Sequence, residues 1–444
     1  MIQKTFLLLF VALLPFASAA AQDNNRFVDV IVALDVEHRS QGRAENIGMA
    51  TAVAQDHGVR ASRTYGTVFS GFAARVPEAR LAALRNDPLV ASVSFDQPVS
   101  TMQSCNSPNT PPCDGGGDGG GDTGSSQTVP WGIERIGATL NANTGTGTRV
   151  YIIDTGIDAT HPDLQANLGN GFAAVACTDG NGNPRNRRIC DNSWDDDNGH
   201  GTHVAGTVGA IDNDAQVVGV APGVTLHAVK VLDSGGSGTF AGIIEGVDWV
   251  AAEAAALNQA VVANMSLGGG GSKTGSCDNG TFTGDDNLHR AICQATGLGV
   301  VFVVAAGNSG ADAAGAVPAA YDDAVISVSA TNSSDDWASF SNWGDASASW
   351  TANASAPVAI AAPGVSILST WFDGGTNTIS GTSMSSPHVA GGAALFMTSN
   401  NQSANFSAFA NTRAGLLSTA EDASGFSNTT GDPHAEDFLD ASAL

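Results

Sequence analysis

The sequence predicts an α/β fold, with a mostly parallel sheet and helices on both faces, behind a smaller α+β domain at the N-terminus. The chain has 444 residues, of which 42% are apolar and 14% charged, so it can bury a large core and exceeds one ordinary domain. The apolar runs Val150–Ile153 and Val301–Val304 are typical of strands buried in a parallel sheet. Helix-like stretches follow His200 and Ser383, and strands that alternate with helices indicate the α/β class.

The first residues have the three regions of a secretory signal peptide, which we assign to residues 1–21. A start containing Lys4 precedes the apolar run Thr5–Leu14, and a tail of small residues ends at Ala21. The apolar run is too short to span a bilayer comfortably and nothing comparable follows, so we expect a secreted, extracellular protein without a membrane anchor. Six cysteines fit export to an oxidising compartment, and a formal net charge of −25 argues against nucleic-acid partners.

Residues 22–103 are expected to form the small α+β domain. Alternating and helix-like patterns predict strands and helices in the order βαββαβ. In chain order the predicted elements are Phe27–Leu34, a helix Gln41–His57, Ser62–Val68, Ser70–Val76, a helix Pro77–Arg85 and Val90–Phe95. An independent ferredoxin-like binding domain is an alternative, because it would show the same order.

Residues 104–127 predict a flexible linker, because they are rich in glycine, aspartate and proline and cannot bury enough apolar surface to fold. The six cysteines of the chain can pair in many ways. They occur as close neighbours in short polar loops, so we favour bridges that each pin one exposed loop. These pairs are Cys105 with Cys113, Cys177 with Cys190, and Cys277 with Cys293.

Three separated segments supply an aspartate, a histidine and a serine that suit a nucleophilic hydrolase. Asp154 follows an apolar strand, at the sheet edge where α/β folds place ligands. His200 precedes a helix whose positive end would keep the imidazole neutral. Ser383 opens a second helix, Met384–Met397, whose free amides can face a developing oxyanion. Because a serine hydroxyl needs a base and an orienting carboxylate, these residues predict a Ser-His-Asp system.

Taken singly, each of these signals has another interpretation. Asp154-Thr-Gly is also the aspartic protease triplet and recurs at Asp122, but that copy lies in the linker, where no carboxylate dyad could be held. His200 and His203 could suggest a metal site, but Gly201 stands where the zincin pattern requires glutamate. A serine before a helix is usually an N-cap. Only the combination favours catalysis.

The three segments resemble the motifs of subtilisin-like serine proteases, and the resemblance runs from about Val129 to the C-terminus. Two more segments match the family: Val301–Gly310, which contains Asn308, and Val261–Gly269. The resemblance implies that the Asn308 side chain and the Ser383 amide form the oxyanion hole.

The same resemblance implies a domain organisation. Residues 128–444 are expected to be a subtilisin-like peptidase domain with a doubly wound, mostly parallel sheet, ending in a closing helix near Phe438–Ala441. Residues 22–103 resemble the inhibitory chaperone propeptide of the family, with the first cut near Gln103. The implied function is a secreted serine endopeptidase of broad specificity, made as a self-processing zymogen.

Substrates would bind as an extended peptide between two strands of the protein, through backbone hydrogen bonds that ignore side-chain identity. The residues that match these strands are Gly236, Ser237, Gly238, Ser266, Leu267 and Gly268, and Phe240 matches an aromatic residue at the fourth subsite. Small uncharged residues would line the first pocket, so we expect apolar or aromatic side chains at P1, the residue before the cut. These are Gly268, Gly269, Ala305, Ala306 and Ala316. The expected partners are protein and peptide substrates and the chain's own propeptide, with a monomeric enzyme.

Two other functions stay open at this point. One is a catalytically silent subtilisin-like binding protein, which is disfavoured because Asp154, His200, Ser383 and Asn308 are all present. The other is a secreted esterase with the same triad. An α/β-hydrolase would carry its histidine last in the chain, whereas here the serine is last.

The resemblance also implies structural calcium (Ca²⁺). The expected ligands are side-chain oxygens of Gln127, Asp163 and Asn213 with carbonyl oxygens of Ile211, Ala215 and Val217. The run Asp195–Asp197 is a candidate for a second ion. In the family the first cut falls just before the ligand Gln, but here residues 103–126 intervene and could stretch to about 80 Å. We therefore expect Gln127 to dock, and calcium to bind, before the chain is cut.

Overall fold

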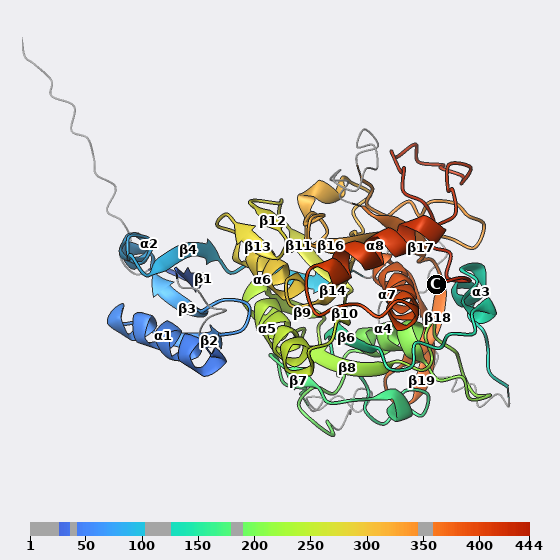
Figure 1. Cartoon of the computed structure of the whole chain (residues 1–444), viewed down its shortest axis with the longest axis horizontal. Coiled ribbons are helices and arrows are strands. Elements are labelled where there is room, and N and C mark those ends of the chain that lie inside the picture. Colours follow the sequence, from blue (N-terminus) through green and yellow to red (C-terminus); the bar gives the residue numbers. More distant parts are fainter. Residues whose placement is uncertain (1–25, 36–41, 103–125, 179–189, 345–357) are drawn as a thin grey trace, which may run out of the picture.

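The computed structural model describes residues 26–35, 42–102, 126–178, 190–344 and 358–444 (Figure 1). The predicted signal peptide, most of the predicted linker, and Cys105 and Cys113 lie outside these residues. Within the described residues, none of the helices combines the length and the apolar composition that a membrane span requires.

The N-terminal domain is an antiparallel sheet in the order β2-β3-β1-β4 with two helices packed on one face. Its elements are β1 (Phe27–Leu34), α1 (Arg43–Asp56), β2 (Ala61–Tyr65), β3 (Gly71–Pro77), a 3₁₀ turn (Glu78–Arg80), α2 (Leu81–Arg85) and β4 (Val90–Phe95). The predicted βαββαβ order is therefore present. The second helix is shorter than predicted, because Pro77 still pairs with Phe27 in the sheet and a helix can begin only after it.

The large domain is built on a seven-stranded sheet in the order β17-β16-β14-β10-β6-β8-β7, in which all neighbouring strands are parallel. Its strands are β6 (Arg149–Asp154), β7 (Phe172–Ala173), β8 (Thr225–Lys230), β10 (Val261–Met265), β14 (Val300–Ala305), β16 (Val325–Thr331) and β17 (Ile360–Pro363). The helices are α3 (Trp131–Arg135), α4 (His200–Gly209), α5 (Phe240–Leu257), α6 (Asn287–Thr296), α7 (Thr382–Ser399) and α8 (Ser407–Thr419).

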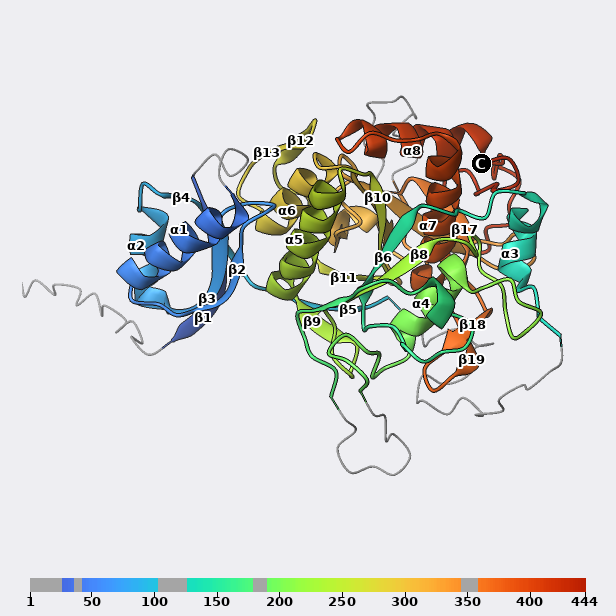
Figure 2. The ribbon, with the colours of Figure 1, turned by 60° about the horizontal axis from the view of Figure 1, so that its bottom comes forward.

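Both faces of this sheet are covered, which explains why its strands are mostly apolar. Along β6, Val150 and Ile152 join one core with α4, α7 and α8, whereas Tyr151 and Ile153 join a second core with α5 and α6 (Figure 2). Since successive side chains of a strand point to opposite faces, a strand between two layers must be apolar at every position. The predicted doubly wound α/β fold is confirmed.

Three small sheets complete the large domain. One contains β15 (Ala316–Val317), β11 (Leu267–Gly270), β5 (Pro98–Thr101) and β9 (Ser237–Thr239). The others are the hairpins β12 (Ser276–Asp278) with β13 (Thr281–Thr283), and β18 (Ile367–Trp371) with β19 (Gly375–Ile379). The disulfide Cys277–Cys293 ties the first hairpin to α6, and Cys177–Cys190 bridges residues 177 and 190 in the segment between β7 and α4.

The predicted closing helix at Phe438–Ala441 is wrong, because this segment is extended. The backbone of Phe438 exchanges two hydrogen bonds with Glu421, of 2.7 and 2.8 Å, and Leu439 donates to the carbonyl of Ala361 in β17 at 2.9 Å. These partners take the amide and carbonyl groups that a helix would use. Helix α8 is the last helix among the described residues.

Candidate active site

The structure brings Asp154 and His200 together from two adjacent elements. Asp154 is the last residue of β6 and His200 the first of α4, and both side chains are fully buried. Nδ1 of His200 lies 2.8 Å from Oδ1 of Asp154. Because a carboxylate can only accept, Nδ1 must carry the proton, which leaves the Nε2 lone pair of a neutral ring available as a base.

Ser383 lies in the first turn of α7, but its hydroxyl does not contact the base. The hydroxyl donates to the carbonyl of Ser266 at 3.0 Å, while Nε2 of His200 is buried without a hydrogen-bond partner among the described residues. For Ser383 to be hydrogen-bonded to its base, its hydroxyl must leave the carbonyl of Ser266. Such bonds often form only when the reacting group is in place.

The carbonyl oxygen of Met102 lies between two donors near Ser383. The Ser383 amide donates to it at 3.2 Å and the Asn308 side-chain amide at 2.5 Å. Asn308 follows β14 and is held by Thr382, whose amide and hydroxyl both donate to its side-chain oxygen, at 2.9 and 2.8 Å. Two donors on one oxygen fix which end of the Asn308 amide faces Met102. This role of Thr382 was not predicted, although Thr382 stands directly before the serine.

The residues before Met102 form β5, a strand that was not predicted. It lies between β11 and β9 and runs antiparallel to both, as an extended substrate would. Thr101 donates to the carbonyl of Gly236 at 3.0 Å, and Met102 to that of Ser266 at 3.1 Å. Five residues predicted for substrate binding, Gly236, Ser237, Gly238, Leu267 and Gly268, therefore flank this segment, as does the carbonyl of Ser266.

Side chains of Val99 and Met102 lie beside residues predicted to line the fourth subsite and the first pocket. The Met102 methyl group lies 2.5 Å from where a Cβ on Gly268 would stand, so the absence of a side chain there makes room for it. Val99 is buried, and it lies beside Gly269 together with the ring of Phe240. Ala305 and Ala306 are buried and Ala316 is half-buried.

The N-terminal domain contacts the large domain through α5 and α6 (Figure 1). Oδ1 of the buried Asp248 accepts three backbone hydrogen bonds, from Gly66 at 3.1 Å, Thr67 at 2.6 Å and Val68 at 2.9 Å, and its other oxygen pairs with Arg43. At the start of α5, Asp96 accepts from the amide of Ala241 at 2.9 Å. Arg63 pairs with Glu245 in the same helix. These contacts place the small domain over the helix that follows β9.

The predicted calcium ligands converge around one carboxylate. Oδ1 of Asp163 accepts from the Asn213 amide at 2.9 Å and Oδ2 from the Val217 backbone at 3.1 Å, and the Gln127 amide contacts the carbonyls of Ile211 at 2.7 Å and Val217 at 3.0 Å. Ala215 donates its backbone amide to Asn213. Burial raises the pKa of Asp163 to about 6, against the two hydrogen bonds, which lower it.

Two residues of the same loop, Asp214 and Gln216, have left-handed backbone with φ of 63° and 47°. Such a conformation is costly away from glycine and persists where the surroundings impose it. A loop bent around one buried carboxylate, with amide and carbonyl oxygens beside it, fits a hard cation that prefers oxygen ligands.

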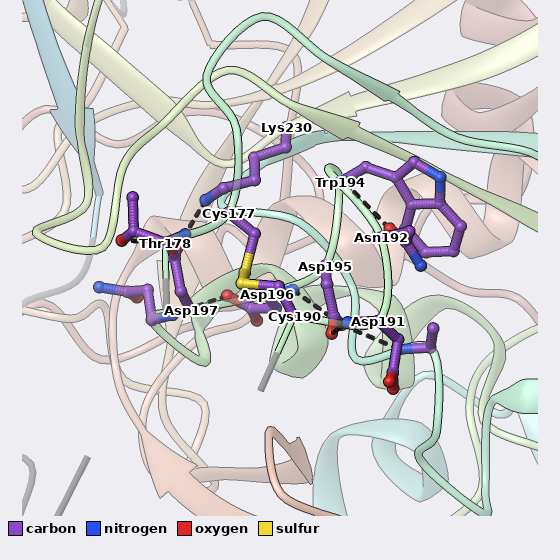
Figure 3. The surroundings of a disulfide bond; sticks show 12 residues. Cys177, Thr178, Cys190, Asp191, Asn192, Trp194, Asp195, Asp196, Asp197 and Lys230 are labelled. Atoms are coloured by element: carbon purple, nitrogen blue, oxygen red, sulfur yellow. Dashed lines mark hydrogen bonds and ion pairs between the residues drawn. A yellow bond between two sulfur atoms is a disulfide. The ribbon is translucent and has the colours of Figure 1, made fainter. Parts of the chain in front are cut away.

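The three aspartates proposed for a second ion point in different directions (Figure 3). Asp195 accepts from the amides of Ala159 and Asp191, and Asp197 pairs with the buried Lys230 at 2.6 Å. Asp196 accepts from its own loop, from α4 and from the hydroxyl of Thr155. The described residues contain no group of three or more His, Cys, Asp or Glu that could hold a metal, so the structure gives this second ion no support and it stays a prediction.

Comparison with known proteins agrees with this site. The subtilase family profile matches residues 145–437, and the peptidase inhibitor I9 profile matches residues 20–102. The chain is 38% identical to an extracellular serine proteinase of Thermus sp. (strain Rt41A) over 350 residues, which cover 77% of this chain and 69% of that protein. It is 41% identical to subtilisin DY of Bacillus licheniformis over 278 residues, or 61% of this chain and 85% of that protein.

A solved structure of a cold-adapted subtilisin-like serine proteinase superposes with a TM-score of 0.54 at 37% identity, covering 71% of this chain and 99% of that one. The chain therefore belongs to the subtilase family, and it is a serine endopeptidase with an inhibitor I9 propeptide domain in front of its peptidase domain.

Proposed function

We propose that Ser383 is the nucleophile of this secreted endopeptidase, that His200 is its general base, and that Asp154 orients His200. When the Ser383 hydroxyl turns from the Ser266 carbonyl towards Nε2 of His200, it loses its proton to that nitrogen as its oxygen attacks the scissile carbonyl carbon. The imidazolium then gives the proton to the leaving amine as the peptide bond breaks. Water hydrolyses the acyl-enzyme in the reverse sequence of proton transfers, which frees Ser383.

The observation that carries this proposal is the position of the Met102 carbonyl between the amides of Ser383 and Asn308. A tetrahedral intermediate places negative charge on that oxygen, and donors already aimed at it stabilise the charge without reorganisation. We therefore assign Asn308 to the oxyanion hole and treat Pro98–Met102 as the first substrate of the enzyme.

The same geometry sets the first cut between Met102 and Gln103 in our proposal. The propeptide then covers residues 22–102, one residue shorter than the sequence-based boundary, and follows a signal peptide at 1–21. The linker reaches residue 127 and the peptidase domain covers 128–444. After the cut the propeptide would stay bound as an intramolecular inhibitor, because the strand pairing of β5 does not depend on the broken bond.

We propose broad specificity with apolar or aromatic side chains at P1. Strand pairing recognises any extended backbone, so selectivity depends on the pockets. Met102 lies over Gly268, and Ala305, Ala306 and Ala316 offer no charge to a basic or acidic P1 side chain. A substrate profile dominated by lysine or arginine at P1 would contradict this preference. We further propose that the enzyme is a monomer without a membrane anchor or a nucleic-acid partner.

We propose that Gln127, Asp163 and Asn213, with the carbonyls of Ile211, Ala215 and Val217, hold structural Ca²⁺. A bound calcium ion would neutralise the buried charge of Asp163 and tie the start of the peptidase domain to the loop after α4. The Gln127 and Asn213 amides would then present oxygen rather than nitrogen to the ion, and for Asn213 this flip gives up the hydrogen bond that its oxygen accepts from Ala215.

Casein hydrolysis by the wild-type chain and by Ser383→Ala tests the function. The wild type should digest casein, lose this activity to a serine-directed covalent inhibitor, and show a new N-terminus at Gln103 by mass spectrometry. Ser383→Ala should stay uncut and inactive. Hydrolysis of esters without casein would favour an esterase, activity on neither would favour a silent binding protein, and casein digestion by Ser383→Ala would refute the mechanism.

A further inference from the structure

The side chain of Asp196 lies four residues before His200 and is fully buried. A side chain that caps a helix usually accepts from one amide of the first turn. Asp196 accepts five hydrogen bonds. We propose that Asp196 is a positioning residue for catalysis, which locks the end of the Asp154 strand to the start of the His200 helix and favours the charged state of His200. This inference rests on the proposed roles of His200 and Ser383.

Four of the five bonds come from the loop and helix that carry the base. The amides of Asn198 and Gly199 donate to Oδ1 of Asp196 at 3.0 and 2.9 Å, and the amide and hydroxyl of Thr202 donate to Oδ2 at 2.9 and 2.6 Å. These groups enclose His200 on both sides in the sequence. The amides at a helix start lack partners within the helix, and Asp196 satisfies one of these in α4, that of Thr202, together with two amides of the loop before it.

The fifth bond reaches the strand that carries the other catalytic carboxyl. The hydroxyl of Thr155, the residue after Asp154, donates to Oδ1 of Asp196 at 2.9 Å. That hydroxyl accepts from the amide of Gly201 at 2.8 Å, and the Thr202 hydroxyl accepts from the amide of Asp158 at 3.0 Å. Since a hydroxyl has one proton, both hydroxyl protons must point at Asp196, and all five partners are donors. The network therefore links the residues that follow β6 to α4, with hydrogen bonds donated from each side to the other.

The charge of Asp196 has a chemical consequence for His200. The first turn of α4 has positive electrostatic potential, which disfavours the imidazolium that forms when Ser383 gives up its proton. An anion held in the same turn offsets that potential. Asp196 should thus stabilise the charged His200 without touching it, while the hydrogen bonds keep Nδ1 aligned with Asp154.

The neighbouring Asp195 offers a matched control. It is also fully buried and also accepts backbone hydrogen bonds, but these come from Ala159 at 3.2 Å, Asp191 at 3.1 Å and Asp196 itself at 3.1 Å, and not from α4 (Figure 3). A loss of stability through removal of a buried carboxylate should affect both positions. A loss of catalytic alignment should affect Asp196 alone.

The test compares Asp196→Asn with Asp195→Asn in the full-length chain after self-processing, with rates divided by the number of active sites titrated with a covalent inhibitor. For Asp196→Asn we expect kcat to fall about tenfold to 100-fold with KM within about twofold, because peptide binding depends on β9 and β11. The acidic limb of the kcat/KM profile should move to lower pH by about half a unit, since the imidazolium loses a favourable charge. Asp195→Asn should keep kcat and the pH profile within about twofold.

If Asp196→Asn does not fold, the variants Thr202→Val and Thr202→Ser test the same hydrogen-bond network. The valine variant should lose kcat with KM retained, and the serine variant should recover most of it because it restores the donor. The inference would be overturned if Asp196→Asn and Asp195→Asn had equal effects, or if the loss appeared in KM. It would also be overturned if the acidic limb stayed in place or moved to higher pH, or if the two Thr202 variants were equally active. Casein digestion by Ser383→Ala would instead overturn the proposed function, so the two failures are distinguishable.

Discussion

Two segments, one before the linker and one at its end, contact the peptidase domain, and the two contacts are of different kinds. Pro98–Thr101 pairs with β9 and β11 through the backbone, and the carbonyl of Met102 accepts from the amide of Ser383. Gln127 is held by its side chain, which contacts the carbonyls of Ile211 and Val217. A backbone contact accepts any extended peptide and can pass from propeptide to substrate, whereas a side-chain contact depends on one residue and suits a permanent attachment.

Both contacts are made in one uncut chain. A tether of residues 103–126 could stretch to about 80 Å, so neither contact needs to strain the other. The contact of Met102 with the active site and the contact of Gln127 with the loop proposed to bind calcium can therefore form independently, which makes the comparison testable.

The largest effect is expected from Asn308→Ala, which removes a donor at the groove. Loss of one oxyanion donor typically lowers kcat by about 10²–10³. Because the same amide contacts the Met102 carbonyl, the first cut should slow by a similar factor. Pulse-chase processing and peptide kinetics measure the two rates, with Asn411→Ala on α8 as the control. A first cut of normal rate with slow peptide turnover would show that the propeptide tail is not held as a substrate.

Gly268→Ala should narrow the P1 pocket. A Cβ at this position would meet the Met102 methyl group at 2.5 Å and the Val317 carbonyl at 2.9 Å, so large P1 side chains should lose about 10- to 200-fold in kcat/KM relative to alanine. Gly270→Ala is the matched control, because nothing lies within 4 Å of its Cβ position. Equal losses for large and small P1 residues would mean that Gly268 does not line the pocket.

Gln127→Ala in the Ser383→Ala precursor tests the other contact. The uncut precursor should already bind calcium tightly and be stabilised by it, and loss of the Gln127 oxygen should weaken the affinity about tenfold. Titration calorimetry measures this, with Gln259→Ala as the control. Calcium affinity that appears only after the propeptide is cut away would contradict independent docking, as would a first cut immediately before Gln127.

The smallest effect concerns pH and the contact between the two domains. Burial raises the pKa of Asp96 and of Glu245, although the Ala241 hydrogen bond lowers the first and Arg63 the second. An acid whose pKa is higher in the complex takes up a proton on binding, so the contact strengthens as pH falls towards these raised values and is weakest above them.

Release of the cut propeptide should accordingly be a few-fold slower near pH 5 than near pH 8. The cut complex is incubated at each pH, and free enzyme is then measured in one common assay buffer. Glu245→Gln should flatten this dependence. Faster release at the lower pH would show that other groups control the contact.

The success of sequence-based prediction differed between elements for physical reasons. Strand β1 was predicted at its observed bounds, because the alternation that indicates a strand is present in its own residues. Strand β5 was missed, because four residues beginning with proline form a strand only when β9 and β11 lie on both sides. The helix expected at Phe438–Ala441 failed for the converse reason, since Glu421 and Ala361 supply partners that only the folded chain brings close.

The sequence by itself determined the family, the α/β class and the residues with the right chemistry, because a nucleophile, a base, a carboxylate and an amide donor require particular residue types in particular local settings. Only the tertiary structure decided which carbonyl lies between the Ser383 and Asn308 amides, that the Ser383 hydroxyl donates to Ser266, and that three consecutive aspartates have different partners. Those outcomes depend on hydrogen bonds between groups far apart in the chain. Such bonds depend on where folding places the backbone, and a local sequence pattern does not contain these positions.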